Sequence, residues 1–321
     1  MNVKNFKSRY SFVEPFDVYP SRDIMKRQSH ELEYIKLCFV LHLYWIGPLS
    51  EHAPNLLKYV DSIWPLISPH LTHFRDNKKR GTPAKLKKET GEVLRSWLDD
   101  PAKAPKAMAL MDVYKKTWDP EATDFRLNFR GLDFRGGGGV ELYLPAEWAE
   151  SDPKSMRDLC AKLAGTFEFC SGMAGFGLCT GEDYGRTAAL PHLYALGRHH
   201  PGLDLDTTIS NFAGQGIKGV NWLTFLHPNF VERLGGRPTL RAMLNLPEVE
   251  IVDLPSGVMI QAGPAPEIGD TNAQSNCPYY RRVGQVLATI RDKRFPGLFG
   301  PSGSTSSSAE TTEEWLGRFD S

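Results

Sequence analysis

One fifteen-residue run, EYIKLCFVLHLYWIG at positions 33–47, constrains the fold more than any other part of the chain. Every second residue is large and apolar, the set being Ile35, Leu37, Phe39, Leu41, Leu43 and Trp45. A period of two places these side chains on one side of an extended strand. The alternate positions mix apolar residues with Lys36 and His42. We therefore expect a long, largely buried strand near the N-terminus whose second face is partly polar.

The overall composition is that of an ordinary globular protein. The chain has 321 residues, of which 41% are hydrophobic and 24% charged, and this length allows two domains or one large one. Its formal net charge is zero, so nothing in the bulk composition indicates nucleic acid or a membrane surface as a partner. No run of about 18 apolar residues occurs, which argues against a membrane-spanning helix.

The N-terminus and the cysteines indicate a cytoplasmic protein. The first residues, MNVKNFKSRY, carry scattered charges where a signal peptide needs an apolar core. The five cysteines are an odd number at irregular spacing, which is typical of reduced, buried thiols. They are Cys38, Cys160, Cys170, Cys179 and Cys277.

In the first half of the chain, strands and helices alternate in a recognisable order. The long strand is followed by a helix from about Pro54, strands at 125–129 and 140–144, a helix that begins at Ser151 or Asp152, and a small-residue strand, SGMAGFGLCTG. The order strand, helix, strand, strand, helix, strand is that of a ferredoxin-like, split βαβ unit with an insertion after its first helix.

The second half shows a similar order of elements. A helix at 188–196, a strand within 217–226, short helices at 228–234 and 239–244, a hairpin turning at 255–257 and a final helix starting at 278 are expected. The fold class is therefore α+β, with antiparallel β-sheets packed against helices, and two ferredoxin-like halves in tandem are a further hypothesis. The expected divisions are an N-terminal extension (1–30), a first half (31–184) with a basic loop (75–92), a second half (185–297) and a flexible tail (298–321).

The usual signatures of cofactor and metal sites are missing from the sequence. FRGGGGVEL is followed by a strand instead of a helix N-terminus, which makes it a turn rather than a phosphate loop. The cysteines and histidines between 170 and 200 match none of the usual zinc spacings. We expect neither cofactor nor metal.

Four carboxylates on expected loops allow several interpretations. They are Glu182, Asp183, Asp204 and Asp206. Together with Asp270 they could bind Mg²⁺ in a metal-dependent hydrolase or nuclease, although the lysine that normally accompanies such a site is missing near them. They could be solvated caps, or they could present negative charge to a basic partner.

The run IKGVNWLTFL at 217–226 also allows two interpretations, a core strand or a functional site. Its apolar neighbours favour core placement for Trp222, although tryptophan is also frequent at interface hot spots. Gly219 would permit a bulge or the close approach of another backbone, and Asn221 would satisfy buried loop backbone. We therefore interpret this run as a signature of the fold.

Five segments taken in order resemble the type VI secretion immunity family associated with VRR-type nuclease effectors. They are RHHPGLDLD, GIKGVNWLTFL, LGGRPTLRAML, GVMIQAGPAPEIGDTN and PYYRRV. The resemblance spans roughly residues 30–295 and is strongest from 201 to 283. The motif residues in this part are Gly219, Asn221, Trp222, Gly263 and Asp270.

The resemblance implies a cytoplasmic, non-catalytic immunity protein that binds a cognate toxic effector, commonly a DNA-cutting nuclease, and blocks its active site. No direct contact with nucleic acid or membrane is implied. Because such a nuclease must attract phosphate, we expect the four loop carboxylates to face its basic cleft. The metal-dependent hydrolase remains the alternative.

Overall fold

One large sheet organises the protein. The computed structural model describes residues 1–18, 28–76, 84–86, 99, 109–114, 121–132, 137–181, 184–205, 214–273, 276–293 and 309–320. Eleven strands form the sheet in the order β12-β13-β11-β9-β3-β8-β7-β6-β4-β5, and β10 pairs with β9. They are β3 (Ile35–Ile46), β4 (His73–Asp76), β5 (Ala84–Lys85), β6 (Ala109–Tyr114), β7 (Arg126–Leu132), β8 (Gly137–Pro145), β9 (Ser171–Thr180), β10 (Asp204–Leu205), β11 (Leu223–Leu226), β12 (Val249–Leu254) and β13 (Gly257–Ala262).

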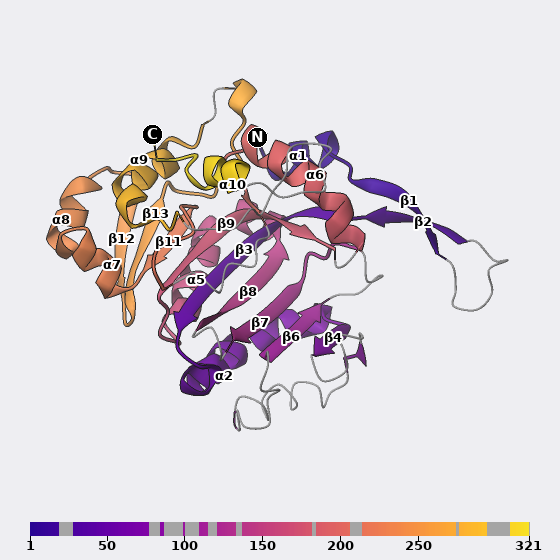
Figure 1. The fold of residues 1–321 in the computed structure, drawn as a ribbon, viewed down its shortest axis with the longest axis horizontal. Coiled ribbons are helices and arrows are strands. Elements are labelled where there is room, and N and C mark those ends of the chain that lie inside the picture. Colours follow the sequence, from indigo (N-terminus) through magenta and orange to yellow (C-terminus); the bar gives the residue numbers. More distant parts are fainter. Residues whose placement is uncertain are drawn as a thin grey trace.

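The alternating run at 33–47 forms the central strand β3, which confirms the prediction of a long, largely buried strand. It pairs antiparallel with β8 on one side and with β9 on the other, so that Leu41 lies opposite Leu142 and Ala174. Figure 1 shows β3 in the middle of the sheet, with β11, β13 and β12 towards one end and β6 and β4 towards the other. The pairings between strands of this sheet are antiparallel except that of β9 with β10, so the expected α+β class with an antiparallel sheet is confirmed.

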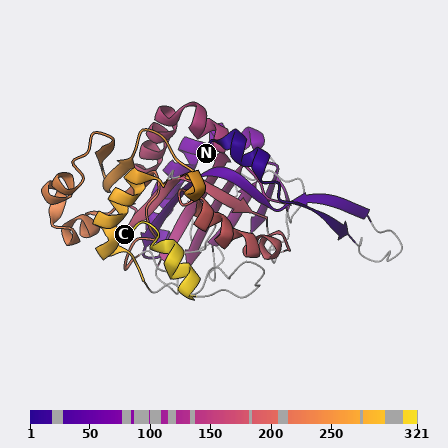
Figure 2. The ribbon, with the colours of Figure 1, turned by 90° about the horizontal axis from the view of Figure 1, so that it is seen from above.

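Helices cover both faces of this sheet. They are α1 (Val3–Arg9), α2 (Leu49–Ile67), η1 (Ser68–His70), α4 (Ala146–Ser151), α5 (Pro153–Ala164), α6 (Tyr184–His199), α7 (Pro228–Arg233), α8 (Gly236–Met243), η5 (Thr271–Ala273), α9 (Pro278–Leu287), η6 (Ala288–Ile290) and α10 (Ala309–Leu316). Figure 2 shows α5 on one side of the sheet and α6 with α10 on the other. The strands near the middle of the sheet are therefore shielded on both sides.

The helix boundaries follow local chemistry. Asp152 accepts a hydrogen bond from the backbone N–H of Ser155 and caps α5, as the sequence predicts. Helix α2 begins at Leu49, earlier than the expected Pro54, and runs through Pro54 and Pro65. Its apolar face, with Leu56, Tyr59 and Ile63 fully buried, holds the helix on the sheet. Tertiary packing here overrides the tendency of proline to end a helix.

The expected tandem of ferredoxin-like halves is not confirmed. The strands β11, β13 and β12 of the second half extend the same sheet from β9. The sheet is therefore continuous across the expected boundary at residues 184 and 185.

The N-terminal region is more structured than an extension. Val3 and Phe6 of α1 are buried against the body, and Asn2 caps the helix by accepting from the backbone N–H of Asn5. Strands β1 (Val13–Val18) and β2 (Gln28–Glu33) form an antiparallel hairpin that extends away from the body in both views (Figures 1 and 2). Neither feature is predicted from the sequence, because neither shows a long period of apolar residues.

The C-terminal segment also differs from the expected flexible tail. Residues 309–320 pack on the body, and Trp315, Leu316 and Phe319 are buried. The guanidinium of Arg291 lies 2.8 Å from a carboxylate oxygen of Glu313 and 2.6 Å from one of Asp320. The serine-rich composition just before this segment led to the wrong expectation, whereas the apolar side chains that follow hold it on the body.

This packing predicts that Trp315→Ala lowers the free energy of unfolding by about 3–5 kcal/mol, because a fully buried indole is removed. Urea denaturation followed by circular dichroism measures the change. Glu310→Ala, at an exposed position of the same helix, is the matched control and should stay within about 0.5 kcal/mol of the parent protein. Equal stability of both variants would show that the segment does not pack as described.

Candidate functional site

The run at 217–226 is only partly a strand. Leu223–Leu226 forms β11 between β9 and β13, whereas 217–222 approach it as irregular, buried backbone. Ile217 fixes the start of this approach, because its N–H donates to the carbonyl of Ile290 and its carbonyl accepts from the N–H of Asp292. The strand expected within 217–226 is therefore confirmed, and it is limited to Leu223–Leu226.

Asn221 and Trp222 use their polar atoms to satisfy backbone groups in the interior. The side-chain oxygen of Asn221 accepts from the N–H of Trp222 at 2.8 Å, and its amide donates to the carbonyl of Phe176 at 3.3 Å. The indole N–H of Trp222 donates to the carbonyl of Gly263 at 3.0 Å. Both side chains are fully buried. Their role in this arrangement is to join β9, β11 and β13.

Glycines provide the space for this arrangement, though not all where we expected. A Cβ at position 175 would lie 2.0 Å from the side-chain oxygen of Asn221, so glycine is required there. Gly263 has φ of +91°, a conformation that favours glycine. At Gly219 a Cβ would have one neighbour, the carbonyl oxygen of Leu316 at 3.8 Å. The close backbone approach expected at Gly219 is therefore not found.

A buried ion pair lies beside this segment. The Lys218 ammonium lies 2.7 and 2.9 Å from the two carboxylate oxygens of Asp204 and donates to the carbonyl of Leu205 at 3.0 Å. Nδ1 of His42 lies 3.3 Å from Oδ2 of Asp204. The ammonium also lies 5.7 Å from the centre of the Trp315 ring, a cation–π contact with α10.

The small residues of β9 allow this cluster to form. His42 is on β3 and Asp204 is on β10, and β9 lies between these two strands. Asp204 lies opposite Gly177, and a Cβ at Gly177 would come within 2.9 Å of Val40 and 3.1 Å of the Asp204 carbonyl. The glycines therefore let side chains from both neighbours meet over the strand.

The electrostatics of Asp204 follow from its partners. Burial alone would raise the pKa of this carboxyl, but the Lys218 ammonium and the His42 imidazole outweigh burial and hold the pKa below its usual range. Asp204 thus stays ionised although its side chain is only 1% exposed.

This position corrects one expectation about the acidic loops. Asp204 is enclosed, so its carboxylate cannot face a partner, and no local pattern predicts that Lys218 neutralises it. Glu182, Asp183 and Asp206 lie outside the described residues. Most of the basic loop at 75–92 lies outside them too.

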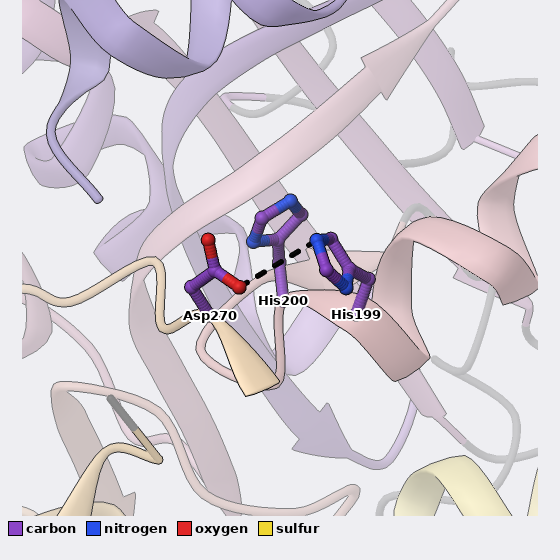
Figure 3. Close-up of side chains that lie close together, drawn as sticks. All are labelled: His199, His200 and Asp270. Atoms are coloured by element: carbon purple, nitrogen blue, oxygen red, sulfur yellow. Dashed lines mark ion pairs between the residues drawn. The ribbon is translucent and has the colours of Figure 1, made fainter. Parts of the chain in front are cut away.

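A second polar cluster joins the end of α6 to the loop before α9. It contains His199, His200 and Asp270 (Figure 3). Each residue offers one atom that could bind a metal ion, and these three atoms lie within 4.8 Å of one another. His200 is fully buried, and its two ring nitrogens contact the carbonyl of Gly269 at 2.8 Å and the hydroxyl of Tyr10 at 2.9 Å. Burial lowers the pKa of His200, which favours the neutral imidazole.

Asp270 shares its two carboxylate oxygens among different partners. Oδ2 lies 3.3 Å from the guanidinium of Arg9. Oδ1 accepts from the N–H of Asn272 at 3.0 Å and lies 3.6 Å from Nε2 of His199 (Figure 3). The spacing of the histidines alone did not predict this cluster, because its third member lies seventy residues further along the chain.

The cysteines do not have the properties of nucleophiles. All five are free and buried. Burial raises the pKa of Cys170 and of Cys277 to about 12, and both thiols therefore stay protonated at neutral pH. This agrees with the expectation of reduced, buried thiols.

Comparison with known proteins identifies the family. No curated protein sequence matches the chain. A solved structure described as "Pseudomonas aeruginosa T6SS protein PA0821" is similar to it, with a TM-score of 0.79 at 23% identity, covering 91% of this chain and 84% of that one. The TsiV family model, described as "Type VI immunity for VRR-NUC", matches residues 66–319. The chain belongs to the TsiV family.

Membership of the TsiV family makes the chain a type VI secretion immunity protein for a VRR-NUC effector, as the sequence resemblance implies. An immunity family suggests a protein that is not an enzyme. The matched region extends to residue 319 and so includes α10, which the resemblance at 30–295 left out. Among the described helices, none has both the length and the apolar character needed to cross a bilayer.

The buried ion pair leads to a stability prediction. Lys218→Met should lower the free energy of unfolding at pH 7 by about 3–5 kcal/mol, because Asp204 is left buried and unpaired. A D204L/K218M double variant, which removes both charges, should recover most of this loss. Urea denaturation of each variant measures both effects, and Lys162→Met, at an exposed lysine, is the control.

The same variants should differ in their response to acid. In the parent protein the lowered pKa of Asp204 contributes stability that is present above the ordinary value of 3.8 and is lost as the pH falls below it. Without Lys218 the folded-state pKa rises, so the deficit of Lys218→Met should shrink as the pH is lowered from 7 towards 4. If the stability deficit of Lys218→Met does not change with pH, the deficit does not come from the unpaired Asp204 carboxylate.

Proposed function

We propose that this TsiV-family protein binds a cognate DNA-cutting nuclease effector of the VRR type and neutralises it by blocking its active site. The family match over residues 66–319 is the observation that carries the proposal. Inhibition by occlusion needs a complementary surface and no chemistry of its own. About 1,200–2,000 Å² of total buried surface is typical of a specific complex of this kind.

The arrangement of polar groups supports a binding role over catalysis. Asp204, the one of the four expected contact carboxylates that lies among the described residues, is neutralised by Lys218 in the interior instead of facing solvent. The side chains of Asn221 and Trp222 form their hydrogen bonds with backbone groups. Within the described residues, these parts of the family resemblance therefore stabilise the fold.

Three acidic residues remain our proposed contacts to the effector. Glu182 and Asp183 follow the end of β9 in the sequence, and Asp206 follows the end of β10. These two strands are parallel neighbours, so both strands end at the same edge of the sheet. Negative charge there would attract a phosphate-binding cleft and would increase the association rate.

Co-expression with the VRR-type nuclease effector that we expect to be encoded beside this gene tests the proposal. We expect the cells to survive, a complex to co-purify, and DNA cleavage in vitro to stop at one equivalent of the immunity protein. Protection without a complex, or at far below one equivalent, would instead indicate an enzyme that modifies the toxin or repairs its damage. Death of the co-expressing cells would contradict the assignment of this partner.

The charge contribution is tested with a triple variant, E182Q/D183N/D206N. We expect its association rate with the nuclease to fall about 10-fold at low salt and its salt dependence to flatten. The matched control is D158N/E250Q/D253N, which removes three exposed carboxylates elsewhere on the surface. Equal rates for the two triple variants at low salt would exclude the acidic contact while leaving the immunity function in place.

A further inference from the structure

The cluster at the end of α6 has the donor set of a transition-metal site. Two imidazoles and one carboxylate suit Zn²⁺ and its neighbours in the first transition row, whereas Ca²⁺ and Mg²⁺ require more oxygen ligands. Three protein ligands can hold Zn²⁺ when a water molecule takes the fourth position. His200 and Asp270 are buried, and His199 is partly exposed at the edge of the cluster.

The distance between two of the ligand atoms fits an ion of this size. Zinc bonds of about 2.1 Å in tetrahedral geometry place neighbouring ligand atoms about 3.4 Å apart. Nε2 of His199 and Oδ1 of Asp270 are 3.6 Å apart, which is too long for a good hydrogen bond. Nε2 of His199 is moreover a buried nitrogen for which no hydrogen-bond partner is found among the described residues.

The contacts around the two rings orient them for a cation. When Nδ1 of His199 donates to the hydroxyl of Thr271, 3.3 Å away, the lone pair of Nε2 faces the carboxylate of Asp270. Nδ1 of His200 faces the carbonyl of Gly269 and must donate to it, which leaves the lone pair on Nε2. A backbone carbonyl that fixes the tautomer in this way is typical of metal-binding histidines.

We propose that His199, His200 and Asp270 bind one divalent transition-metal ion, Zn²⁺ being the best fit, which ties the end of α6 to the loop before α9. The ion takes Nε2 of each histidine and Oδ1 of Asp270. Two neighbours at the end of α1 limit its affinity. The hydroxyl of Tyr10 is hydrogen-bonded to Nε2 of His200, and this bond must break before the ion can bind there. The guanidinium of Arg9 pairs with Oδ2, the other carboxylate oxygen of Asp270.

Metal binding to the full chain, without any effector, tests this proposal independently of the immunity function. After treatment with a chelator, the protein is titrated with Co²⁺ and then with Zn²⁺. We expect one equivalent of Co²⁺ to give visible absorption typical of low-coordinate cobalt, Zn²⁺ to displace it, and the thermal midpoint to rise by several degrees in excess Zn²⁺.

The variants identify the ligands. His199→Gln removes a partly exposed ligand and should weaken Zn²⁺ binding by about 100-fold or more while the protein stays folded. His192→Gln, on the same helix outside the cluster, should bind as the parent does. Tyr10→Phe frees Nε2 of His200 and should bind Zn²⁺ several-fold more tightly.

Three results would overturn the site. The first is the absence of binding at one equivalent, which would leave an ion pair between His199 and Asp270 as the role of the cluster. The second is equal loss of binding in His192→Gln and His199→Gln, which would indicate surface imidazoles. The third is unchanged affinity in Tyr10→Phe, which would exclude Nε2 of His200 as a ligand.

Discussion

The buried pair of Lys218 and Asp204 is the interaction on which the middle of the structure depends. Removing two charges from water costs several kcal/mol each, and mutual attraction offsets this cost only with good geometry and further hydrogen bonds. Both carboxylate oxygens of Asp204 lie within 3 Å of the ammonium, which also donates to the carbonyl of Leu205. The pair therefore fixes β10 against the segment that leads into β11.

The requirement for such a pair explains features that lie far from it in the sequence. The sheet must leave room above β9, and glycines there supply it. Solvent must also be kept out on the α10 side, where Trp315 lies over the ammonium and Arg318 stacks on the same ring at 4.0 Å. The C-terminal segment thus encloses a charge cluster that belongs to the centre of the sheet. The family match continues to residue 319 and so includes this segment.

Sequence reasoning succeeded where one local period decides the structure. The alternation in β3, the cap at Asp152 and the hairpin of β12 and β13 depend on neighbouring residues, and all three are present. It failed where distant partners decide, because the sequence shows neither the pairing of Asp204 with Lys218 nor the meeting of Asp270 with His199. The serine-rich composition before residue 309 predicted a flexible tail, but at 309–320 the burial of Trp315 holds the segment on the body.

The location of the family motifs limits where partner specificity can lie. Asn221, Trp222 and Gly263 form one hydrogen-bonded unit in the core, so a nuclease cannot contact their polar atoms without unfolding the sheet. Such residues fix how the scaffold folds, whichever effector is bound. Discrimination between effectors requires contacts that only the correct partner satisfies. These contacts must come from surface residues outside this unit. The family resemblance therefore establishes the class of protein, whereas the identity of its nuclease depends on residues outside the buried part of the motif.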